Sequence, residues 1–552
     1  MNLFERETSK GTNPVLKLVL GLTLVLLQAF VTSGCSTLSS RYFGPAGGPV
    51  GPVPLSRYQP SPFVNADSGP ILVGLACSGG GSRAAYLTAA VLREIRRSEL
   101  RIDVGNRSTD NKYLLDQIDF VSAVSGGALS AGYFVANIDQ LRADLESEAW
   151  EDYLNKMAAN YRQRQWYWHG ILNPISWFKA LFTKFNRGNI ARDDYDNMLF
   201  EGKTIADLPE RPVLYLNAFD VGNRVRFVFS RHFIDTGFYH EKGWTNKLGE
   251  PQDLTSENDL VFSRIDPKTV RLADAVYASS AFPFAYPNLA LRHFGSKIPY
   301  QGSLVFLADG GLADNSGLLT LFTQMSIEFD RLKNSRLVVA IYIDASLDST
   351  RHGTLFQVQG TEADYAWRDT YVGHGRAGVE AGFGHLQDRL SIFLEKTGVL
   401  MDDIILNYKT KLLSMPPSPD REERASWFGE YSSGRLLLRP LAIGLRLRDV
   451  GEAYYTLWSR YKNEGAKDVR LLRLFEASGI PSGFDQNGWP AKSFQALVLE
   501  RRVSELKTDF VLGKSGRKVL DLVAYLLVHG KLKPALTKWS RIASTRFKEE
   551  QD

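Results

Sequence analysis

Residues 118–133 constrain the fold of this chain more than any other stretch. The segment begins with the apolar run Ile118-Asp119-Phe120-Val121-Ser122-Ala123-Val124, continues through Ser125-Gly126-Gly127, and then has the composition of a helix that opens with small residues. A buried strand, an abrupt turn and a helix form the setting of a nucleophile elbow, in which a serine hydroxyl lies exposed at the top of a sheet. The pattern alone is weak, because a serine beside glycines also occurs in ordinary turns. Ser125 is therefore a candidate nucleophile that needs support from the rest of the chain.

Length, composition and charge exclude several classes of protein. A chain of 552 residues is long enough for two or three structural units. Its 44% hydrophobic and 23% charged residues are typical of a globular protein and argue against a disordered or fibrous one. The net charge of +5 is small for this length, so we expect no nucleic-acid partner.

Cysteine and histidine usage argues against a metal centre. The chain has two cysteines, Cys35 and Cys77, which cannot build a disulfide framework or a cysteine-rich metal site. The eight histidines are scattered and show no metal-ligand spacing. We therefore expect no metal and no cofactor.

The N-terminal 35 residues predict a lipoprotein-type signal peptide. A basic start is followed by an uncharged apolar run from Leu18 to Val31, which is shorter than the roughly 20 residues of a membrane-spanning helix. The alternative is a short signal anchor that stays in place. Ser33-Gly34-Cys35 resembles the lipobox of bacterial lipoproteins, although Thr32 stands where leucine is usual. The resemblance implies lipidation of Cys35 and a location in the bacterial cell envelope, as an outer-membrane lipoprotein that faces the periplasm.

A tether and a glycine-rich loop follow. Residues 36–68 are rich in Gly, Pro and Ser and have too little apolar surface to fold, so they predict a tether. The apolar run Ile71–Cys77 then predicts a buried strand that leads into Gly79-Gly80-Gly81 and a helix. Backbone N–H groups at such a helix start can bind an anion, and an oxyanion hole is the functional interpretation. A plain flexible turn is the alternative.

A third candidate segment contains Asp309. The apolar residues 305–308 predict a strand that delivers Asp309 into the turn Gly310-Gly311, at a sheet edge where a partner can face it. Further apolar runs at 213–218 and 337–343 predict more strands. Beyond about residue 350 the pattern is less legible, but 450–550 has largely helical character.

The three segments together resemble the patatin-like phospholipases, a family related to cytosolic phospholipase A2. Residues 78–84 are similar to the oxyanion loop of that family, 123–127 to its serine motif, and 309–311 to its aspartate motif. Residues 211–217 and 278–283 also resemble segments of the family. The resemblance covers about residues 69–345. It implies a three-layer α/β/α core there, and we expect residues 346–552 to continue this core in part and to be largely helical. The departure is Ala123, which stands where the usual Gly-x-Ser-x-Gly pattern has glycine.

The resemblance also implies the chemistry of the site. Ser125 is the nucleophile, Asp309 is the base that acts on it directly without a histidine, and the backbone N–H groups of Gly79, Gly80 and Gly81 form the oxyanion hole. Arg83 is a candidate for binding a substrate phosphate, with a surface salt bridge as the alternative. A Ser-His-Asp triad is the rival mechanism. Its candidate histidines are His232, His240, His293, His352, His374 and His385.

The expected function is hydrolysis of fatty-acyl esters in phospholipids through an acyl-Ser125 intermediate. The partner is a membrane phospholipid substrate, and lipidated Cys35 associates the protein with the membrane. Acyl transfer to another acceptor and cleavage of neutral lipids are alternatives that use the same site. A catalytically idle lipid-binding lipoprotein is an alternative of a different class.

Overall fold

The structure is a computed structural model, and the residues that it describes begin at Ile71. The predicted signal peptide and the predicted tether, residues 1–35 and 36–68, lie outside the described residues. The described residues are 71–102, 113–143, 148–161, 163–176, 186–222, 225–232, 257–259, 265–283, 285–292, 304–321, 324–325, 337–346, 428–430, 436–438, 441–490, 496–504, 506 and 512–549.

Strands and helices alternate in the first half of the described chain, and helices dominate after residue 446. The strands are β1 (Ile71–Cys77), β2 (Ile118–Val124), β3 (Val213–Asp220), β4 (Val225–Phe229), β5 (Glu257–Asp259), β6 (Leu289–Arg292), β7 (Leu304–Asp309), β8 (Leu337–Asp344), β9 (Phe428–Glu430), β10 (Leu436–Leu438) and β11 (Leu441–Arg446).

The α-helices are α3 (Gly81–Arg97), α4 (Ser125–Ala136), α5 (Ile138–Ala143), α6 (Glu148–Met157), α8 (Arg187–Tyr195), α10 (Leu272–Ser279), α11 (Gly311–Asp314), α17 (Val450–Glu464), α18 (Val469–Ser478), α19 (Ala496–Ser504), α20 (Lys514–Leu527) and α21 (Lys533–Glu549). Short 3-10 and π-helical segments are η3 (Leu114–Gln117), η4 (Gln163–Ile171), η5 (Asp196–Phe200), η6 (Ile205–Asp207), η7 (Pro267–Thr269), η8 (Leu447–Asp449) and η9 (Val528–Leu532).

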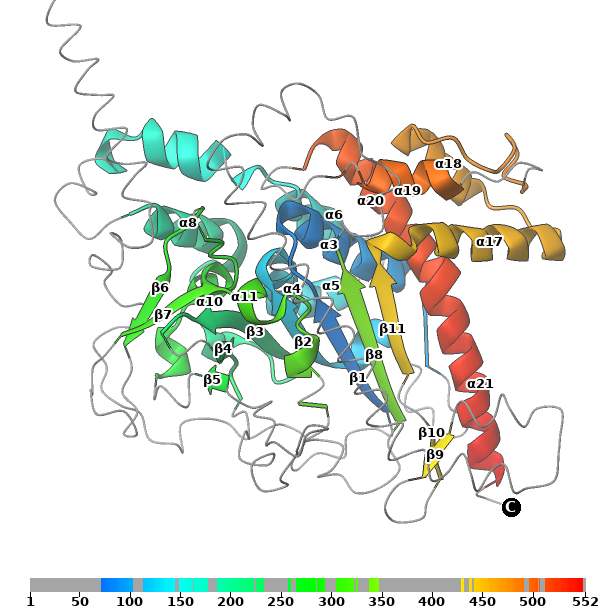
Figure 1. The fold of residues 1–552 in the computed structure, drawn as a ribbon, viewed down its shortest axis with the longest axis horizontal. Helices are drawn as coiled ribbons and strands as arrows, with labels where there is room; N and C mark the ends of the chain where they lie inside the picture. The colour runs from blue at the N-terminus through cyan, green and yellow to red at the C-terminus, as the bar shows by residue number, and fades with distance from the viewer. Residues whose placement is uncertain are drawn as a thin grey trace, which may run out of the picture.

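A mixed sheet forms the centre of the molecule (Figure 1). Its parallel part has the order β11-β8-β1-β2-β3. β4 and β7 run antiparallel to β3, and β5 and β6 extend the sheet from them. Because β1 and β2 are parallel and Cys77 pairs with Ala123, the segments that follow these two strands leave the sheet side by side. In open α/β sheets, ligands bind at this carboxyl edge.

Apolar side chains cover both faces of the sheet, which makes it the middle of three layers. On one face, Val73 and Leu75 of β1 join a cluster that includes α3, α4, α10 and the C-terminal helices. On the other face, Leu72 and Ala76 of the same strand pack with residues that include Leu318, Leu321 and Met325. Strands buried on both faces have continuous apolar sequences, as β1 does. The expected three-layer α/β/α core is confirmed.

The C-terminal part contributes to this core rather than standing apart from it. β11 adds a parallel strand beside β8, and α20 packs against α3. The division at residue 345 that the sequence suggested stays a prediction. Within the part of the chain that the structure describes, no helix is both long and apolar enough to cross a bilayer.

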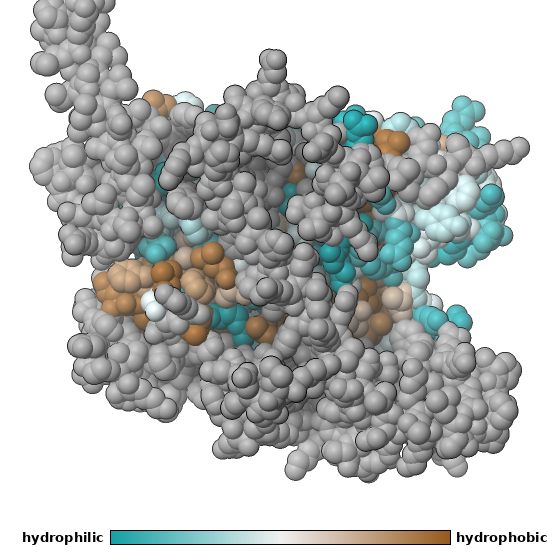
Figure 2. Space-filling view, viewed as in Figure 1, coloured by the Kyte–Doolittle hydropathy of each residue, from teal (hydrophilic) through white to brown (hydrophobic). Residues whose placement is uncertain are grey.

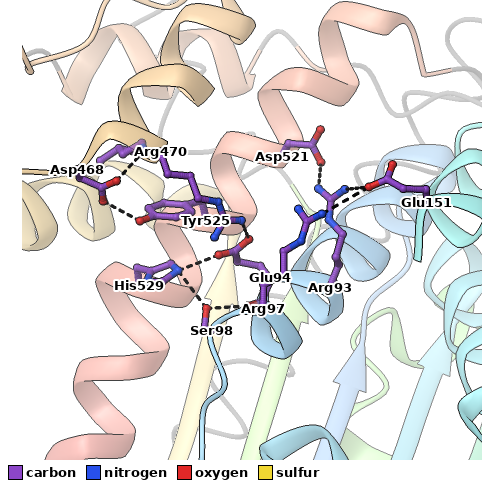
Figure 3. Close-up of polar contacts among 11 residues, drawn as sticks. Arg93, Glu94, Arg97, Ser98, Glu151, Asp468, Arg470, Asp521, Tyr525 and His529 are labelled. Atoms are coloured by element: carbon purple, nitrogen blue, oxygen red, sulfur yellow. Dashed lines mark hydrogen bonds and ion pairs between the residues drawn. The ribbon is translucent and has the colours of Figure 1, made fainter. Parts of the chain in front are cut away.

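Charged side chains fasten the C-terminal helices to α3 (Figure 3). Glu94 of α3 is 3% exposed; it forms an ion pair with Arg470 of α18, and its Oε1 lies 2.8 Å from Nε2 of His529 in η9. Next to it, Arg93 forms an ion pair with Asp521 of α20 at 2.8 Å. Because α3 begins in the glycine-rich loop, these contacts help to fix the position of a helix that carries a candidate part of the site.

Candidate active site

Ser125 lies at a sharp strand-to-helix turn. β2 ends at Val124 and α4 begins at Ser125, whose φ is +52°. A residue other than glycine in this left-handed region costs on the order of 1–3 kcal/mol and persists only where the surrounding structure enforces it. Ala123 is fully buried within β2 and is not among the described residues with positive φ, so alanine fits the position where the usual pattern has glycine.

Glycines let the turn at Ser125 approach the glycine-rich loop. A Cβ atom on Gly126 would lie 2.0 Å from the carbonyl oxygen of Gly81, a distance that real side chains do not adopt. A Cβ atom on Gly79 would lie 3.2 Å from Cβ of Ser125. The loop after β1 is therefore in direct contact with the turn after β2.

Asp309 reaches Ser125 along one edge of β3. β2 pairs with the first part of β3 and ends with Val124 opposite Asn217. β7 runs the other way and ends with Asp309 opposite the next residue, Ala218. The other edge of β3 is occupied by β4 at both positions, so β2 and β7 share one edge and their ends meet. The residue after β2 and the last residue of β7 are thereby brought together.

A direct hydrogen bond joins the two candidate residues. Ser125 Oγ donates to Asp309 Oδ2 at 2.8 Å, and the N–H of Gly311 donates to Asp309 Oδ1 at 2.8 Å. Asp309 is 2% exposed, and burial raises the pKa of its carboxyl to about 7, although these two hydrogen bonds act in the opposite direction. A carboxyl with a pKa close to neutral is suited to accept a proton from a nucleophile.

In the glycine-rich loop, one backbone N–H group is already hydrogen-bonded within the protein, and two others are candidate donors to an oxyanion. The N–H of Gly79 donates to the carbonyl oxygen of Asn315 at 2.9 Å, so this group is already in use. Gly80 has a φ of +143°, which only glycine adopts readily, and Gly81 is the first residue of α3. Of the three glycines that the sequence suggested, Gly80 and Gly81 are the better candidates for an oxyanion hole, and this role stays a prediction for all three.

Sequence reasoning missed two buried polar residues beside the dyad. Ser279, at the end of α10, accepts a hydrogen bond from the N–H of Ser125 at 3.0 Å. Asn217 lies in the apolar strand β3 and is 1% exposed. A polar residue inside an otherwise apolar strand is the signal that could have identified Asn217. Ser279 lies among small residues in a segment for which the sequence indicated a family resemblance, but no pattern there singles out its hydroxyl.

The structure describes only one of the histidines proposed for a triad. His232 is buried at the end of the segment that follows β4, and its backbone N–H donates to Ser230 Oγ. His240, His293, His352, His374 and His385 lie outside the described residues. The hydroxyl of Ser125 donates its hydrogen bond to Asp309. Catalysis by this pair without a histidine stays a prediction.

Arg83 lies within α3 and points into the protein. It is 2% exposed, and its Nη1 donates to the carbonyl oxygen of Leu506 at 2.6 Å. The guanidinium therefore contacts the C-terminal part of the chain. Its predicted contact with a substrate phosphate stays a prediction.

Two other expectations concern ligands and lipidation. Among the residues that the structure describes, no group of three or more His, Cys, Asp and Glu side chains could hold a metal ion. Cys35 lies outside the described residues, so its lipidation stays a prediction. Cys77 is buried at the end of β1.

Comparisons with known proteins give a family for the region that contains this site. Among solved structures, human GIVD cytosolic phospholipase A2 in complex with methyl gamma-linolenyl fluorophosphonate has 12% identity and a TM-score of 0.35, with 87% of this chain and 61% of that chain covered. The same human protein alone has 10% identity and a TM-score of 0.36, with 87% of this chain and 65% of that chain covered. Its complex with the inhibitor and terbium chloride has 12% identity and a TM-score of 0.38, with 93% of this chain and 64% of that chain covered.

This chain spans less than two thirds of the length of those structures, and TM-scores below 0.5 are too low to support conclusions about this one. The comparison with curated proteins found no match. The family model described as Patatin-like phospholipase matches residues 75–322, which include Ser125, Asp309 and the glycine-rich loop but amount to less than half of the chain. Residues 75–322 are therefore similar to the patatin-like phospholipase family.

Proposed function

We propose that this protein is a serine acyl hydrolase that cleaves fatty-acyl esters of phospholipids through an acyl-Ser125 intermediate. The observation that carries the proposal is the 2.8 Å hydrogen bond from Ser125 Oγ to Asp309 Oδ2, made by a serine with a φ of +52°. The match of the surrounding residues to the patatin-like phospholipase family model supports the substrate class.

The first half of the proposed reaction forms the acyl-enzyme. Asp309 accepts the hydroxyl proton of Ser125 while Ser125 Oγ attacks the ester carbonyl carbon. The negative charge that develops on the carbonyl oxygen needs donors, and the N–H groups of Gly80 and Gly81 are the candidates in the adjacent loop. Collapse of the tetrahedral intermediate expels the lysophospholipid as an alcohol, which takes the proton from Asp309.

The second half regenerates the enzyme. A water molecule attacks the acyl-Ser125 carbonyl and gives a proton to Asp309, and Ser125 Oγ leaves with that proton as the free fatty acid is released. Asp309 must therefore be ionised at the start of each half-reaction. The burial that raises its pKa to about 7 makes it a stronger base than an exposed aspartate.

Exposed apolar side chains are consistent with a lipid substrate. Trp168, Leu172 and Ile175 are 60%, 59% and 65% exposed and lie within eight residues of one another. Figure 2 shows a further gathering of hydrophobic residues on the face where β6 and β7 lie, and β7 ends at Asp309. Apolar patches on a protein surface are typical of contacts with lipids or with other proteins. The lipidated Cys35 and the outer-membrane location belong to the same proposal and rest on the sequence alone.

Acyl transfer and neutral-lipid cleavage are alternatives that use the same acyl-enzyme. Product analysis separates them: full-length protein is incubated with vesicles of a defined phosphatidylcholine or with triacylglycerol droplets, and the products are resolved by mass spectrometry. We expect free fatty acid and lysophospholipid from wild type, and neither from Ser125→Ala or Asp309→Asn. A new ester in place of free acid would identify transfer, and release from triacylglycerol alone would identify a neutral-lipid lipase. An inactive wild type that still binds the vesicles would favour the idle lipid-binding protein.

A further inference from the structure

Ser279, at the end of α10, is hydrogen-bonded to Ser125 and to Gly310, the residue that follows Asp309. We propose that Ser279 is a positioning residue that fixes the geometry of Ser125 relative to Asp309. This inference rests on the proposed function, because it concerns how the serine and its base are held for reaction. Ser279 is fully buried, so it is not available to touch substrate.

The Ser279 hydroxyl donates one hydrogen bond and accepts another, and the direction of each is fixed. Its Oγ donates to the backbone carbonyl oxygen of Asn217 at 2.6 Å, and a carbonyl can only accept. The hydroxyl proton is therefore committed, and a lone pair of Oγ receives the N–H of Ser125 at 3.0 Å. This hydrogen bond fixes the backbone of Ser125 at the residue that has the left-handed φ of +52°.

The backbone around Ser279 holds the base. The carbonyl oxygen of Ser279 accepts the N–H of Gly310 at 3.1 Å, and the carbonyl oxygen of Ala281 accepts the N–H of Asp309 at 3.1 Å. Residues 279–281 at the end of α10 are thus bonded to the nucleophile through the Ser279 side chain, and through two backbone carbonyls to the base and to the residue after it. The 2.8 Å separation of Ser125 Oγ from Asp309 Oδ2 depends on both attachments.

The side chain of Asn217 links the strand that leads to Ser125 to its neighbours through hydrogen bonds. Its Nδ2 donates to Ser122 Oγ at 2.9 Å and to the carbonyl oxygen of Ala123 at 3.1 Å, both in β2. Its Oδ1 accepts Thr320 Oγ1 at 2.6 Å, and Thr320 Oγ1 accepts Nη1 of Arg226 at 2.7 Å.

The direction of this chain of hydrogen bonds is fixed, because a guanidinium can only donate. All of these side chains are buried. Buried networks of hydrogen bonds make a structure rigid. The network therefore holds β2, β3 and the end of α10 together around Ser125, and this explains how a non-glycine residue keeps a costly φ.

The inference predicts a specific defect when the Ser279 hydroxyl is removed. In Ser279→Ala the N–H of Ser125 loses its acceptor in a buried place, so Ser125 no longer stays aligned with Asp309. We expect the rate of serine acylation to fall about tenfold to a hundredfold, the range expected for loss of one buried hydrogen bond. A weaker hydrogen bond from Ser125 also removes a contact that lowers the pKa of Asp309. The pH midpoint of acylation is therefore expected to rise.

Ser280→Ala is the matched control. Ser280 is the next residue, and its Oγ donates to the carbonyl oxygen of Val276 within its own helix at 2.9 Å. Full-length wild type, Ser279→Ala and Ser280→Ala are reacted with a fluorophosphonate probe over pH 5–9, and thermal unfolding of each is recorded. The inference expects slow labelling and a raised pH midpoint in Ser279→Ala only, with folding retained. If Ser279→Ala does not fold, Ser279→Cys replaces it; sulfur is a weak acceptor, so an intermediate rate and a raised midpoint are expected.

Three outcomes would overturn the inference, and they are distinguishable. In the first, the probe labels wild type, and it labels Ser279→Ala (or Ser279→Cys in its place) with the same rate and pH midpoint. Ser279 then does not position the dyad, and the proposed function stands. The same holds if Ser280→Ala shows an equal loss. If wild type itself does not label, the proposed function fails and the role of Ser279 fails with it.

Discussion

The raised pKa of Asp309 links activity and stability to pH in opposite directions. Burial raises the pKa of this carboxyl from 3.8 to about 7. The proposed base must be ionised, so log(kcat/KM) is expected to rise with unit slope below about pH 7 and to level off above it. The folded state, by contrast, holds a proton that the unfolded chain releases between about pH 4 and pH 7. The contribution of Asp309 to stability is therefore expected to fall as pH rises through this window.

The size of the stability effect follows from the pKa shift. A shift of about 3 pH units corresponds to about 4 kcal/mol, since each unit is worth about 1.4 kcal/mol. Asp309 is 2% exposed, so solvent screens the effect little. Asp309→Asn removes the charge and retains one acceptor oxygen. Relative to wild type, we expect the free energy of unfolding of this variant to increase by up to about 4 kcal/mol between pH 4 and pH 8.

Denaturant unfolding at pH 4, 5, 6, 7 and 8 measures this difference, with the phospholipid hydrolysis rate recorded on the same samples. A stability difference that changes with pH across the window, together with an inactive variant, is the expected result. A difference that is independent of pH would refute the argument that a buried, hard-to-ionise Asp309 serves as the base. A kcat/KM profile that falls only below pH 5 would refute it as well.

Three further predictions concern the supports of the site. His529→Ala removes one hydrogen bond from the buried carboxylate of Glu94, which keeps its ion pair with Arg470. We therefore expect a loss of about 1.5–3 kcal/mol in the free energy of unfolding, measured by urea denaturation; a loss below about 0.5 kcal/mol would contradict the importance of this contact. Gly126→Ala places a Cβ atom 2.0 Å from the Gly81 carbonyl oxygen, and we expect at least a hundredfold lower probe labelling, whereas wild-type labelling would contradict the close approach. Burial raises the pKa of the Cys77 thiol to about 12, so this thiol should not react with a thiol reagent at pH 8 until the protein is unfolded; rapid reaction of the folded protein would show that the end of β1 is open.

The central fold could be predicted because its strands are apolar on both faces. Ile71–Cys77 and Ile118–Val124 read as buried strands in the sequence and are neighbouring strands in the sheet. The place of β11 beside β8 could not be predicted, because a long stretch of sequence separates the two strands. Pairing between distant strands depends on the whole packed core and not on local pattern.

The site was predictable where a local pattern carries it, and not where it depends on tertiary contacts. Ser125 and Asp309 follow apolar strands and adjoin glycines, and these local signals made both of them candidates. Their meeting on one edge of β3 is a matter of sheet topology, which no local pattern contains. The same limit applies to Ser279, because its partner Asn217 lies 62 residues away in the chain. The burial of Arg83 and its contact with Leu506 are likewise tertiary features that no local pattern contains, and its contact with a substrate phosphate stays a prediction.

The central claim is that Ser125 is an activated nucleophile, and site-mapped probe labelling tests it most directly. Full-length protein is reacted with a fluorophosphonate at pH 8, digested, and the modified residue is identified by mass spectrometry, with Ser125→Ala and Asp309→Asn run in parallel. We predict one modified residue, Ser125, in wild type and no modification in either folded variant. Modification of another serine, or equal labelling of Ser125 in Asp309→Asn, would contradict the assignment of nucleophile and base.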